Sequence, residues 1–480
     1  MLKIWFRQRI PRFARHPRAA HGSILFGAAL IACSCAPAPA ADRPNILFLF
    51  ADDQRPDTIS ALGNPAIKTP NLDALVRRGT AFTNAYCMGS TSGAVCNPSR
   101  HQTLSGMSLF RYKKKRPSAA GTFGEVFTQA GYETYHQSKN GNTAKVYHRG
   151  FTHSSYLNDG GVRRSGHHGK SASDTAIAFI EGNKWDRTKP LLMYIGFAGP
   201  HDPRVAAEQW KSLYSPKQIP LPVNYQPFHP LNNGEMFVRD EKLAPWPRTK
   251  DVVRRHLHDY YACISSLDFH IGRILQALDD AGELKNTIVV FSADHGLAVG
   301  SHGLFGKQNL YEHSMGAPLI FAGPGVPHGR SEAFAYLFDI FPTVADMAGV
   351  KYPGDLDGQS LAGVIRGEKS GVRDTVFLAY KSGQRAVRRG RWKLYRFPLI
   401  DRNLLFDLEA DPHEMRDLAG DSAQADRVRK MMDLLAKQQK AYDDPNPLTV
   451  AKPGRAEVDL AFFQKVPPKK PKKPRKKNKG

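Results

Sequence analysis

Residues 45–53 read Asn-Ile-Leu-Phe-Leu-Phe-Ala-Asp-Asp, and this stretch decides the fold class of the chain. Its first part is almost continuously apolar, and it ends in two carboxylates, Asp52 and Asp53. A short apolar run bounded by turn residues is typical of a strand that is buried on both faces. The stretch therefore predicts an interior strand of a sheet, followed at once by polar side chains.

Three more runs have strand length and a similar composition. They span residues 191–197, 287–291 and 317–321. Between the four runs, segments around residues 72–78, 122–130, 174–181 and 257–281 read as helices, and Gly282 suits the end of the last one. Buried strands that alternate with helices indicate a parallel sheet covered on both faces. We therefore expect an α/β fold in which a mostly parallel central sheet is sandwiched by helices.

Polar residues follow three of the four strands. Asp52 and Asp53 follow the first strand, and His201 follows the second. Asp294 and His295 follow the third. Ligands bind beyond the carboxyl ends of strands in open α/β sheets, so these side chains should converge on one edge. Neighbouring carboxylates repel unless a cation neutralises them, and this set suits Ca²⁺ or Mg²⁺ better than zinc. Taken singly, an Asp-Asp pair is also typical of a turn or helix cap.

A polar, glycine-containing loop within residues 90–107 delivers Cys96 to the start of a short helix. Asn97 suits the cap of this helix, Pro98 its first position and Gly106 its end. A helix start gathers free N–H groups and positive dipole, so an anion is favoured beside Cys96. A buried free cysteine next to an ordinary turn is the alternative interpretation.

The net charge of +24 is concentrated at the two ends of the 480-residue chain. Residues 1–18 carry six Lys and Arg and no acid, and residues 469–480 carry eight and no acid. The remaining body, at +10, fits a polyanionic substrate, although solubility alone explains it as well. With 41% hydrophobic and 10% aromatic residues, the chain as a whole is typical of a globular protein and not of a disordered one.

The first 40 residues read as a cleaved export signal. A basic region precedes an apolar stretch at residues 24–32, which is too short to span a membrane, and small residues at 38–40 suit cleavage after Ala40. We expect export to the periplasm or the outside. Residues 30–33 also resemble a lipoprotein cleavage site with Cys33 as the acylated residue. In either case Cys33 and Cys35 lie outside the folded domain, which leaves Cys87, Cys96 and Cys263. Cys263 falls on the apolar face of the last predicted helix and is expected in the core.

We expect the far end, residues 466–480, to be disordered, because residues 467–480 carry no apolar side chain to bury. Such a Lys-rich tail binds anionic polymers through counterion release. For an exported chain, contact with acidic polysaccharide is expected, and no nucleic acid partner is.

Five motifs carry a resemblance to a known family. They are Asp52-Asp53, Cys96-Asn-Pro-Ser-Arg100 followed by Thr-Leu-Ser-Gly106, Pro200-His-Asp-Pro203, Asp294-His-Gly296 and Gly306-Lys-Gln-Asn-Leu-Tyr-Glu-His313. In order and type they resemble the type I, formylglycine-dependent sulfatases of the alkaline phosphatase superfamily, closest to iduronate, choline and glycan sulfatases. The similarity runs from about residue 43 to about residue 430. Near its end, residues 391–395 and 405–414 resemble the family's C-terminal part. The resemblance implies an alkaline phosphatase-like catalytic domain at 42–365 and a smaller α+β subdomain at 366–450.

The resemblance also implies a metal site. Asp52, Asp53, Asp294 and His295 are expected to hold Ca²⁺, with Mg²⁺ as the second choice, together with a formylglycine made from Cys96 by a maturation enzyme. His295 stands where relatives have Asn, Gln or His.

Three further residues take roles by the same resemblance. Arg100 is expected to steady the formylglycine hydrate, Lys307 to contact the sulfate, and His201 to hold or protonate the leaving oxygen.

One segment departs from the family pattern. Many relatives have Gly-Lys-Trp-His after an Ala-Gly-Tyr helix end, but here no His lies two residues after Lys139. Lys145 and His148 reproduce the Lys-x-x-His spacing further on. We expect Lys139, in preference to Lys145, to bind the sulfate, and His148 to supply the missing imidazole. His136 is expected to be a core or surface residue.

The expected reaction is hydrolysis of a sulfate monoester on a sulfated carbohydrate. A cation and several basic side chains neutralise the anionic ester. One hydroxyl of the hydrated aldehyde attacks sulfur while His201 protonates the departing oxygen, and deprotonation of the second hydroxyl then expels sulfate. Two alternatives stay open: a phosphonate monoester or phosphodiester hydrolase that uses the same formylglycine, and a non-catalytic relative that binds polyanions.

Overall fold

A computed structural model describes residues 43–114, 121–139, 143–157 and 165–458, together with residues 461 and 463. These residues all belong to one compact unit. The predicted export signal at 1–40, with Cys33 and Cys35, lies outside the described residues, as does the basic tail at 466–480. Within the described part of the chain, no helix has the length and apolar character needed to cross a bilayer.

The larger sheet has eight strands in the order β5-β4-β6-β1-β7-β8-β2-β9. Their bounds are β1 Asn45–Asp52, β2 Gly79–Tyr86, β4 Glu133–Lys139, β5 His153–Leu157, β6 Leu191–Pro200, β7 Thr287–Ala293, β8 Leu319–Ala322 and β9 Gly329–Tyr336. The predicted first strand lies near the centre, where Leu49 pairs in parallel with Ile195 of β6 and with Phe291 of β7. Both neighbours are also predicted strands, so the carboxyl ends of β1, β6 and β7 meet at one edge.

The fourth predicted strand, β8, runs antiparallel to its neighbours β7 and β2. It is the exception in an otherwise parallel sheet of described strands. The chain leaves β7 at its carboxyl end and stays at that edge through residues 294–318, so it re-enters the sheet in the opposite direction. A mostly parallel sheet is thus confirmed, and the segment that forces the reversal carries several candidate site residues.

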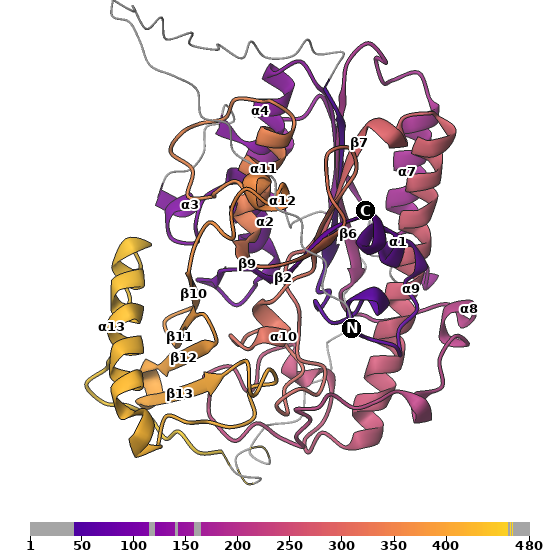
Figure 1. The fold of residues 1–480 in the computed structure, drawn as a ribbon. Helices are drawn as coiled ribbons and strands as arrows, with labels where there is room; N and C mark the ends of the chain where they lie inside the picture. Colours follow the sequence, from indigo (N-terminus) through magenta and orange to yellow (C-terminus); the bar gives the residue numbers. More distant parts are fainter. Residues whose placement is uncertain are drawn as a thin grey trace, which may run out of the picture. The chain divides into compact units, whose positions relative to one another are not determined.

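Alternate residues of β1 enter two separate cores. Ile46, Phe48 and Phe50 pack on the side of α2 (Cys96–Ser105), α4 (Phe123–Gln129) and α11 (Ile340–Met347). Leu47, Leu49 and Ala51 pack on the side of α1 (Pro70–Arg78), α7 (Lys170–Glu181) and α9 (Lys250–Asp280). Figure 1 shows the sheet between these two helical layers. Each fully buried aliphatic or aromatic side chain stabilises the folded state by roughly 1.5–3 kcal/mol. Burial of both sets of side chains therefore fixes which core each residue of β1 enters.

The helices agree with the sequence pattern except at their starts. The helix predicted at 257–281 begins at Lys250, where the Thr249 side chain caps it by accepting a hydrogen bond from Val252 N. Gly282 follows its end with φ +76°, as expected of a stop residue. The remaining short helices are α3 Arg111–Lys114, α5 Lys145–His148, α8 Glu208–Lys211, α10 Glu312–Met315 and α12 Ala362–Ile365.

A second sheet lies in the C-terminal part of the chain. It consists of β10 Thr375–Tyr380, β11 Gln384–Arg389, β12 Trp392–Phe397 and β13 Arg402–Asp407, all antiparallel, with α13 Ala425–Ala441 packed on it. A short strand from the N-terminal part of the chain, β3 (Gly89–Ser90), joins its edge beside β10. At Gly89, with φ +112°, a Cβ would lie 2.0 Å from Ala379 O, so only glycine allows this pairing. The pairing ties the second sheet to the loop that leads to Cys96.

Candidate active site

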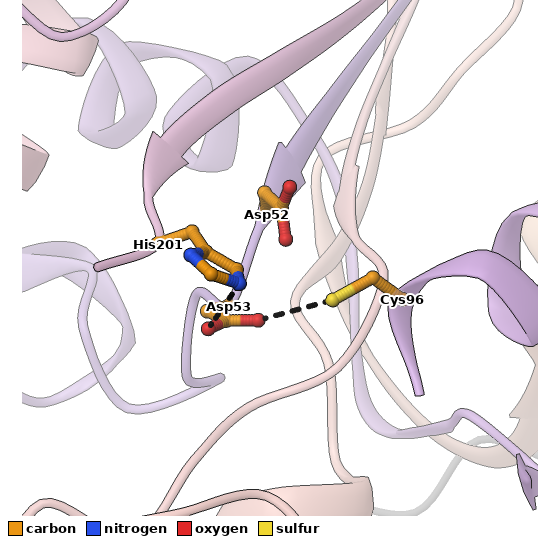
Figure 2. Close-up of side chains that lie close together, drawn as sticks. All are labelled: Asp52, Asp53, Cys96 and His201. Carbon is orange, nitrogen blue, oxygen red and sulfur yellow. Dashed lines mark hydrogen bonds and ion pairs between the residues drawn. The ribbon is translucent and has the colours of Figure 1, made fainter. Parts of the chain in front are cut away.

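The polar residues that follow β1, β6 and β7 converge at the carboxyl edge of the sheet. Figure 2 shows Asp52 at the end of β1, His201 after β6 and Cys96 at the start of α2, with the Asp53 carboxylate between the last two. Asp53 Oδ2 lies 3.8 Å from His201 Nε2, and Asp53 Oδ1 accepts a hydrogen bond from Cys96 Sγ at 3.5 Å. The convergence follows from the parallel register of the three strands.

Two overlapping groups of side chains at this edge have the geometry of a metal site. In each group the ligand atoms lie within 4.8 Å of one another, and the members are Asp52, Asp53, Cys96 and His201 in one and Asp53, Cys96, Asp294 and His295 in the other. All of them are buried. The backbone shapes the site too, because Asp53 has φ +68° and its N–H donates to Asp294 Oδ1 at 2.9 Å.

The helix that begins at Cys96 differs from its prediction in one respect. α2 starts at Cys96 itself, with Val95 at the cap position, so the predicted capping by Asn97 is wrong. Pro98 is therefore the third residue of the helix, where its missing N–H leaves no intrahelical bond unmade. Gly106 ends the helix in the left-handed conformation as predicted, with φ +66°. The shift brings the Cys96 side chain to the first turn, beside the free N–H groups.

Cationic and imidazole groups surround the Cys96 sulfur. Lys307 Nζ donates to Cys96 Sγ at 3.0 Å and to Asp53 Oδ1 at 2.7 Å. His295 Nε2 lies 3.3 Å from the same sulfur, while its Nδ1 lies 2.8 Å from Gly296 O. Sequence reasoning named each of these residues, and the structure brings them within contact of one atom.

Burial opposes ionisation of the two carboxylates after β1, but nearby cations outweigh it. Lys139, His201 and Arg100 hold the pKa of Asp52 well below its usual range. Burial likewise opposes ionisation of Asp53, and His201 and Lys307 hold its pKa below the ordinary value. Both side chains are therefore present as carboxylates at neutral pH, as metal ligands must be.

Asp294, His201 and Cys96 are shifted mainly by burial. Burial raises the pKa of Asp294, with the charge of Asp52 adding to the effect. Burial lowers the pKa of His201. Burial and the Asp52 carboxylate raise the pKa of the Cys96 thiol well above its usual value. An unmodified Cys96 is thus held as the neutral thiol, which is a poor nucleophile.

Arg100 lies behind the carboxylates and is completely buried. Its Nη2 is 3.3 Å from Asp294 Oδ2 and 3.6 Å from Asp52 Oδ2, and its guanidinium stacks 5.1 Å above the ring of Phe50. The residue therefore supports two of the carboxylates from inside the protein.

The two lysine candidates of the divergent segment occupy different places. Lys139 ends β4, and its Nζ donates to Asp52 Oδ2 at 2.9 Å, so it belongs to the cluster. Lys145 begins the short helix α5 and is exposed. His148, at the end of that helix, stacks on Tyr156 at 4.3 Å between ring centroids. Within the described residues no hydrogen bond or ion pair joins His148 to the cluster, and its role toward the sulfate stays a prediction.

His136, which had no predicted site role, is a fully buried core residue. Its ring stacks on Tyr194 at 5.3 Å between centroids, and the Tyr194 hydroxyl accepts a hydrogen bond from Arg100 Nη1 at 3.4 Å. Cys263 is likewise in the core as predicted, with no exposed surface.

The loop that carries Lys307 is held by acidic residues that sequence reasoning missed. The Glu241 carboxylate accepts hydrogen bonds from Phe305 N and Gly306 N at 2.7–3.0 Å. Asp240 Oδ2 accepts one from Gln308 Nε2 at 2.8 Å. Both acids lie in a Pro-rich connection, where no helical or strand period marks them.

The second sheet supports the same loop from its other end. Gln384 Nε2 donates to Gln308 O at 3.0 Å, and Lys393 Nζ and the Tyr395 hydroxyl donate to Leu310 O at 2.9 and 3.1 Å. The C-terminal part of the chain therefore helps to position Lys307 without reaching the cluster itself.

Comparison with known protein families agrees with this arrangement. The sulfatase family model matches residues 44–350, and a model described as the C-terminal part of N-sulphoglucosamine sulphohydrolase matches residues 300–441. The first match covers both the large sheet and every residue of the cluster. The second covers most of the second sheet and α13.

Individual relatives point the same way. The N-acetylglucosamine-6-O-sulfatase of Bacteroides thetaiotaomicron is 28% identical, over 88% of this chain and 91% of the relative. A solved structure of a protein in complex with its substrate, D-glucosamine-2-N,6-O-disulfate, matches with a TM-score of 0.70 at 24% identity, over 85% of this chain and 99% of the other. The phosphonate monoester hydrolase of Agrobacterium radiobacter shares the fold, with a TM-score of 0.67 at 21% identity over 83% and 96% of the two chains. The chain belongs to the sulfatase family of the alkaline phosphatase superfamily and is a sulfuric ester hydrolase.

Proposed function

We propose that this sulfatase acts on a sulfated carbohydrate and that its nucleophile is made from Cys96. One observation carries the proposal: the Cys96 sulfur lies among carboxylates and imidazoles of metal-binding type and is contacted by Lys307 Nζ at 3.0 Å. An attacking group at this position would meet an ester whose negative charge is already neutralised by its surroundings.

The carbohydrate part of the proposal rests on relatives and on charge. The similar protein from Bacteroides thetaiotaomicron is an N-acetylglucosamine-6-O-sulfatase, and the similar solved structure holds a disulfated glucosamine as its substrate. Apart from its two basic ends, the chain keeps a positive balance, which favours polyanionic substrates.

A divalent cation, Ca²⁺ in preference to Mg²⁺, fits the residues at this edge. Asp52, Asp53, Asp294 and His295 would hold it, with the oxygens of the modified residue 96. Asp294 Oδ2 is buried and, beside its ion pair with Arg100 Nη2 at 3.3 Å, accepts no hydrogen bond from the described residues, which leaves room for a metal contact. Carboxylate oxygens are the ligands that hard cations prefer. When bound, the cation would neutralise charge on the ester.

Conversion of Cys96 to formylglycine would allow the sulfated form of the nucleophile to release its sulfate. A serine or cysteine attacking the ester would be left as a stable sulfated residue, whereas a hydrated aldehyde carries a second hydroxyl that releases sulfate. A formylglycine-generating enzyme is thus an expected partner. The neutral, buried thiol of Cys96 is consistent with a residue that acts only after modification.

The remaining charged groups take roles that follow from their contacts. Lys307 and Lys139, which contact Asp53 and Asp52 at 2.7 and 2.9 Å, would bind sulfate oxygens from two sides. His201, 3.8 Å from Asp53, would hold or protonate the leaving oxygen. Arg100 would keep the carboxylates oriented from behind.

The alternative within this superfamily is a phosphonate monoester or phosphodiester hydrolase, since one such enzyme shares the fold. We expect the matured protein to hydrolyse 4-nitrophenyl sulfate with a kcat/KM at least about tenfold above that for bis(4-nitrophenyl) phosphate, a difference of about 1.4 kcal/mol in barrier. The measurement is the rate of nitrophenol release from each. A preference for the phosphodiester would overturn the proposal in favour of the alternative.

Removal of the metal should affect both stability and turnover. Exhaustive chelation removes part of the positive charge that balances the buried carboxylates, so we expect loss of activity and a lower Tm, both restored by added Ca²⁺. A ligand at 100 times its Kd stabilises the folded state by about 2.7 kcal/mol, which is measurable by thermal unfolding. Asp53→Asn should lose the Ca²⁺-dependent rise in Tm, whereas Glu208→Gln, at an exposed position on α8, should keep it. Unchanged Tm and activity after chelation would rule out a bound cation.

A further inference from the structure

Arg239 lies in the connection between β6 and α9, next to the candidate active site. Its Nη2 donates to Asp202 Oδ1 at 2.8 Å, and its Nε donates to Asp240 Oδ1 at 2.7 Å. Nη2 also lies 2.5 Å from Asp240 Oδ1, so two carboxylates together hold the guanidinium in a fixed orientation. Arg239 is therefore a positioned cation, although it stands in a loop.

Each of these carboxylates is also tied to a group of the site. Asp202 Oδ1 lies 3.2 Å from His201 Nδ1. Asp240 Oδ2 accepts a hydrogen bond from Gln308, the residue after Lys307. Arg239 thus bridges the side of the site that holds His201 and the side that holds Lys307. The bridge therefore lies beside two groups of the site, His201 and the loop of Lys307.

In this bridge the cationic side chain is exposed and the two carboxylates are largely buried. The Arg239 side chain is 60% exposed, while Asp202 and Asp240 are 15% and 8% exposed. Guanidinium has five N–H donors, of which Nη1 carries two. Within the described residues, Arg239 Nη1 makes no hydrogen bond, since the contacts to the two carboxylates use Nε and Nη2. The two N–H donors of Nη1 are therefore left for a ligand.

We propose that Arg239 binds a second anionic substituent, a sulfate or a carboxylate, on the sugar whose sulfate ester is hydrolysed. The inference rests on the proposed function and adds the substrate class: doubly anionic sugars in preference to singly sulfated ones. The two N–H donors of Nη1 suit the oxygens of a sulfate or a carboxylate, because hydrogen bonds between charged groups are stronger than those to a neutral hydroxyl group. Arg239 would act in binding and selection, not in bond cleavage.

The test is a binding measurement, with Cys96→Ala as the starting protein so that no probe is turned over. Glucosamine-2-N,6-O-disulfate and N-acetylglucosamine-6-sulfate are compared by calorimetry in the presence of Ca²⁺. We expect the disulfated sugar to bind about 10- to 100-fold more tightly, as a charge-assisted contact provides. Adding Arg239→Gln should remove most of this difference, and Arg239→Lys should restore part of it. A sulfated uronic acid as a third probe separates a carboxylate from a second sulfate.

Lys242→Gln provides the matched control, because Lys242 is an exposed cation three residues further along the same connection. It should leave the preference unchanged. Equal affinity for the disulfated and singly sulfated sugars, or a preference that survives Arg239→Gln, would overturn the inference. If the unsubstituted enzyme hydrolyses the singly sulfated sugar in that case, the proposed function stands alone. If it binds and hydrolyses neither sugar but cleaves aryl sulfate, the carbohydrate assignment fails together with the inference.

Discussion

Cys96→Ala is expected to lower kcat for sulfate esters by roughly 10⁴-fold or more, as removal of the nucleophile does in other covalent catalysts. The sulfur of Cys96 is the atom on which Lys307, His295 and Asp53 converge, so no other described side chain takes its place. The fold should remain, because only one sulfur atom is removed from a residue that already lies at 6% exposure. We expect destabilisation on the order of 1 kcal/mol.

Two measurements separate this loss from a general effect of cysteine replacement. Cys263→Ala, at a buried cysteine of α9, should change stability but not kcat. In active wild-type enzyme, a mass spectrum of the peptide that contains residue 96 should show the aldehyde in place of the thiol. Full activity in Cys96→Ala, or an active enzyme with an unmodified thiol throughout, would place the nucleophile elsewhere.

The central strands, and the residues that meet at their carboxyl edge, were predictable because short stretches of sequence determine them. The apolar run of β1 needs only burial on both faces, and the register of parallel strands then brings Asp52, His201 and Asp294 to one edge. The same reasoning could not give the direction of β8, since an apolar run fits a parallel or an antiparallel neighbour equally well. Its direction depends on the path of residues 294–318, which carry no repeating pattern.

Spacing alone does not tell which side chains contact the cluster where the backbone turns. Lys139 reaches the cluster because it extends β4 toward the carboxyl edge. His148, placed by a Lys-x-x-His spacing, lies on the helical turn α5 and stacks on Tyr156 instead. The contacts that support the Lys307 loop could not be predicted from the sequence for a different reason. Contacts such as the one between Lys393 and Leu310 join residues far apart in sequence, and nothing near either residue signals the other.

Lys393→Met is expected to destabilise the folded protein by about 3–5 kcal/mol, the range for removing one partner of a buried ion pair. Lys393 has no exposed surface, and its Nζ contacts Leu310 O, Glu312 Oε1 and Glu414 Oε1 at 2.9, 2.6 and 2.9 Å. Met fills a similar volume but leaves two adjacent carboxylates with less compensation. The measurement is the free energy of unfolding in denaturant. An unfolding free energy equal to that of the wild type would contradict this account.

A second variant separates charge from packing at the same place. Adding Glu414→Gln to Lys393→Met removes one of the two carboxylates, so part of the lost stability should return. Without Lys393, the ionised form of Glu414 is a buried charge with less compensation. The pKa of Glu414 in the folded state therefore rises further above its value in the unfolded state. The penalty is then absent below the unfolded pKa of a glutamate and present above it, and the loss caused by Lys393→Met should shrink at acidic pH.

The same substitution tests whether the second sheet serves catalysis. Lys393 does not touch the cluster, yet it holds the carbonyl of Leu310, three residues after Lys307. In the folded fraction of Lys393→Met, kcat for aryl sulfate should fall by about tenfold or more, since small displacements of a charge-stabilising group weaken catalysis strongly. Lys351→Met, at an exposed position outside this network, should leave kcat and stability unchanged. If folded Lys393→Met retains the wild-type kcat, the second sheet stabilises the enzyme without positioning Lys307.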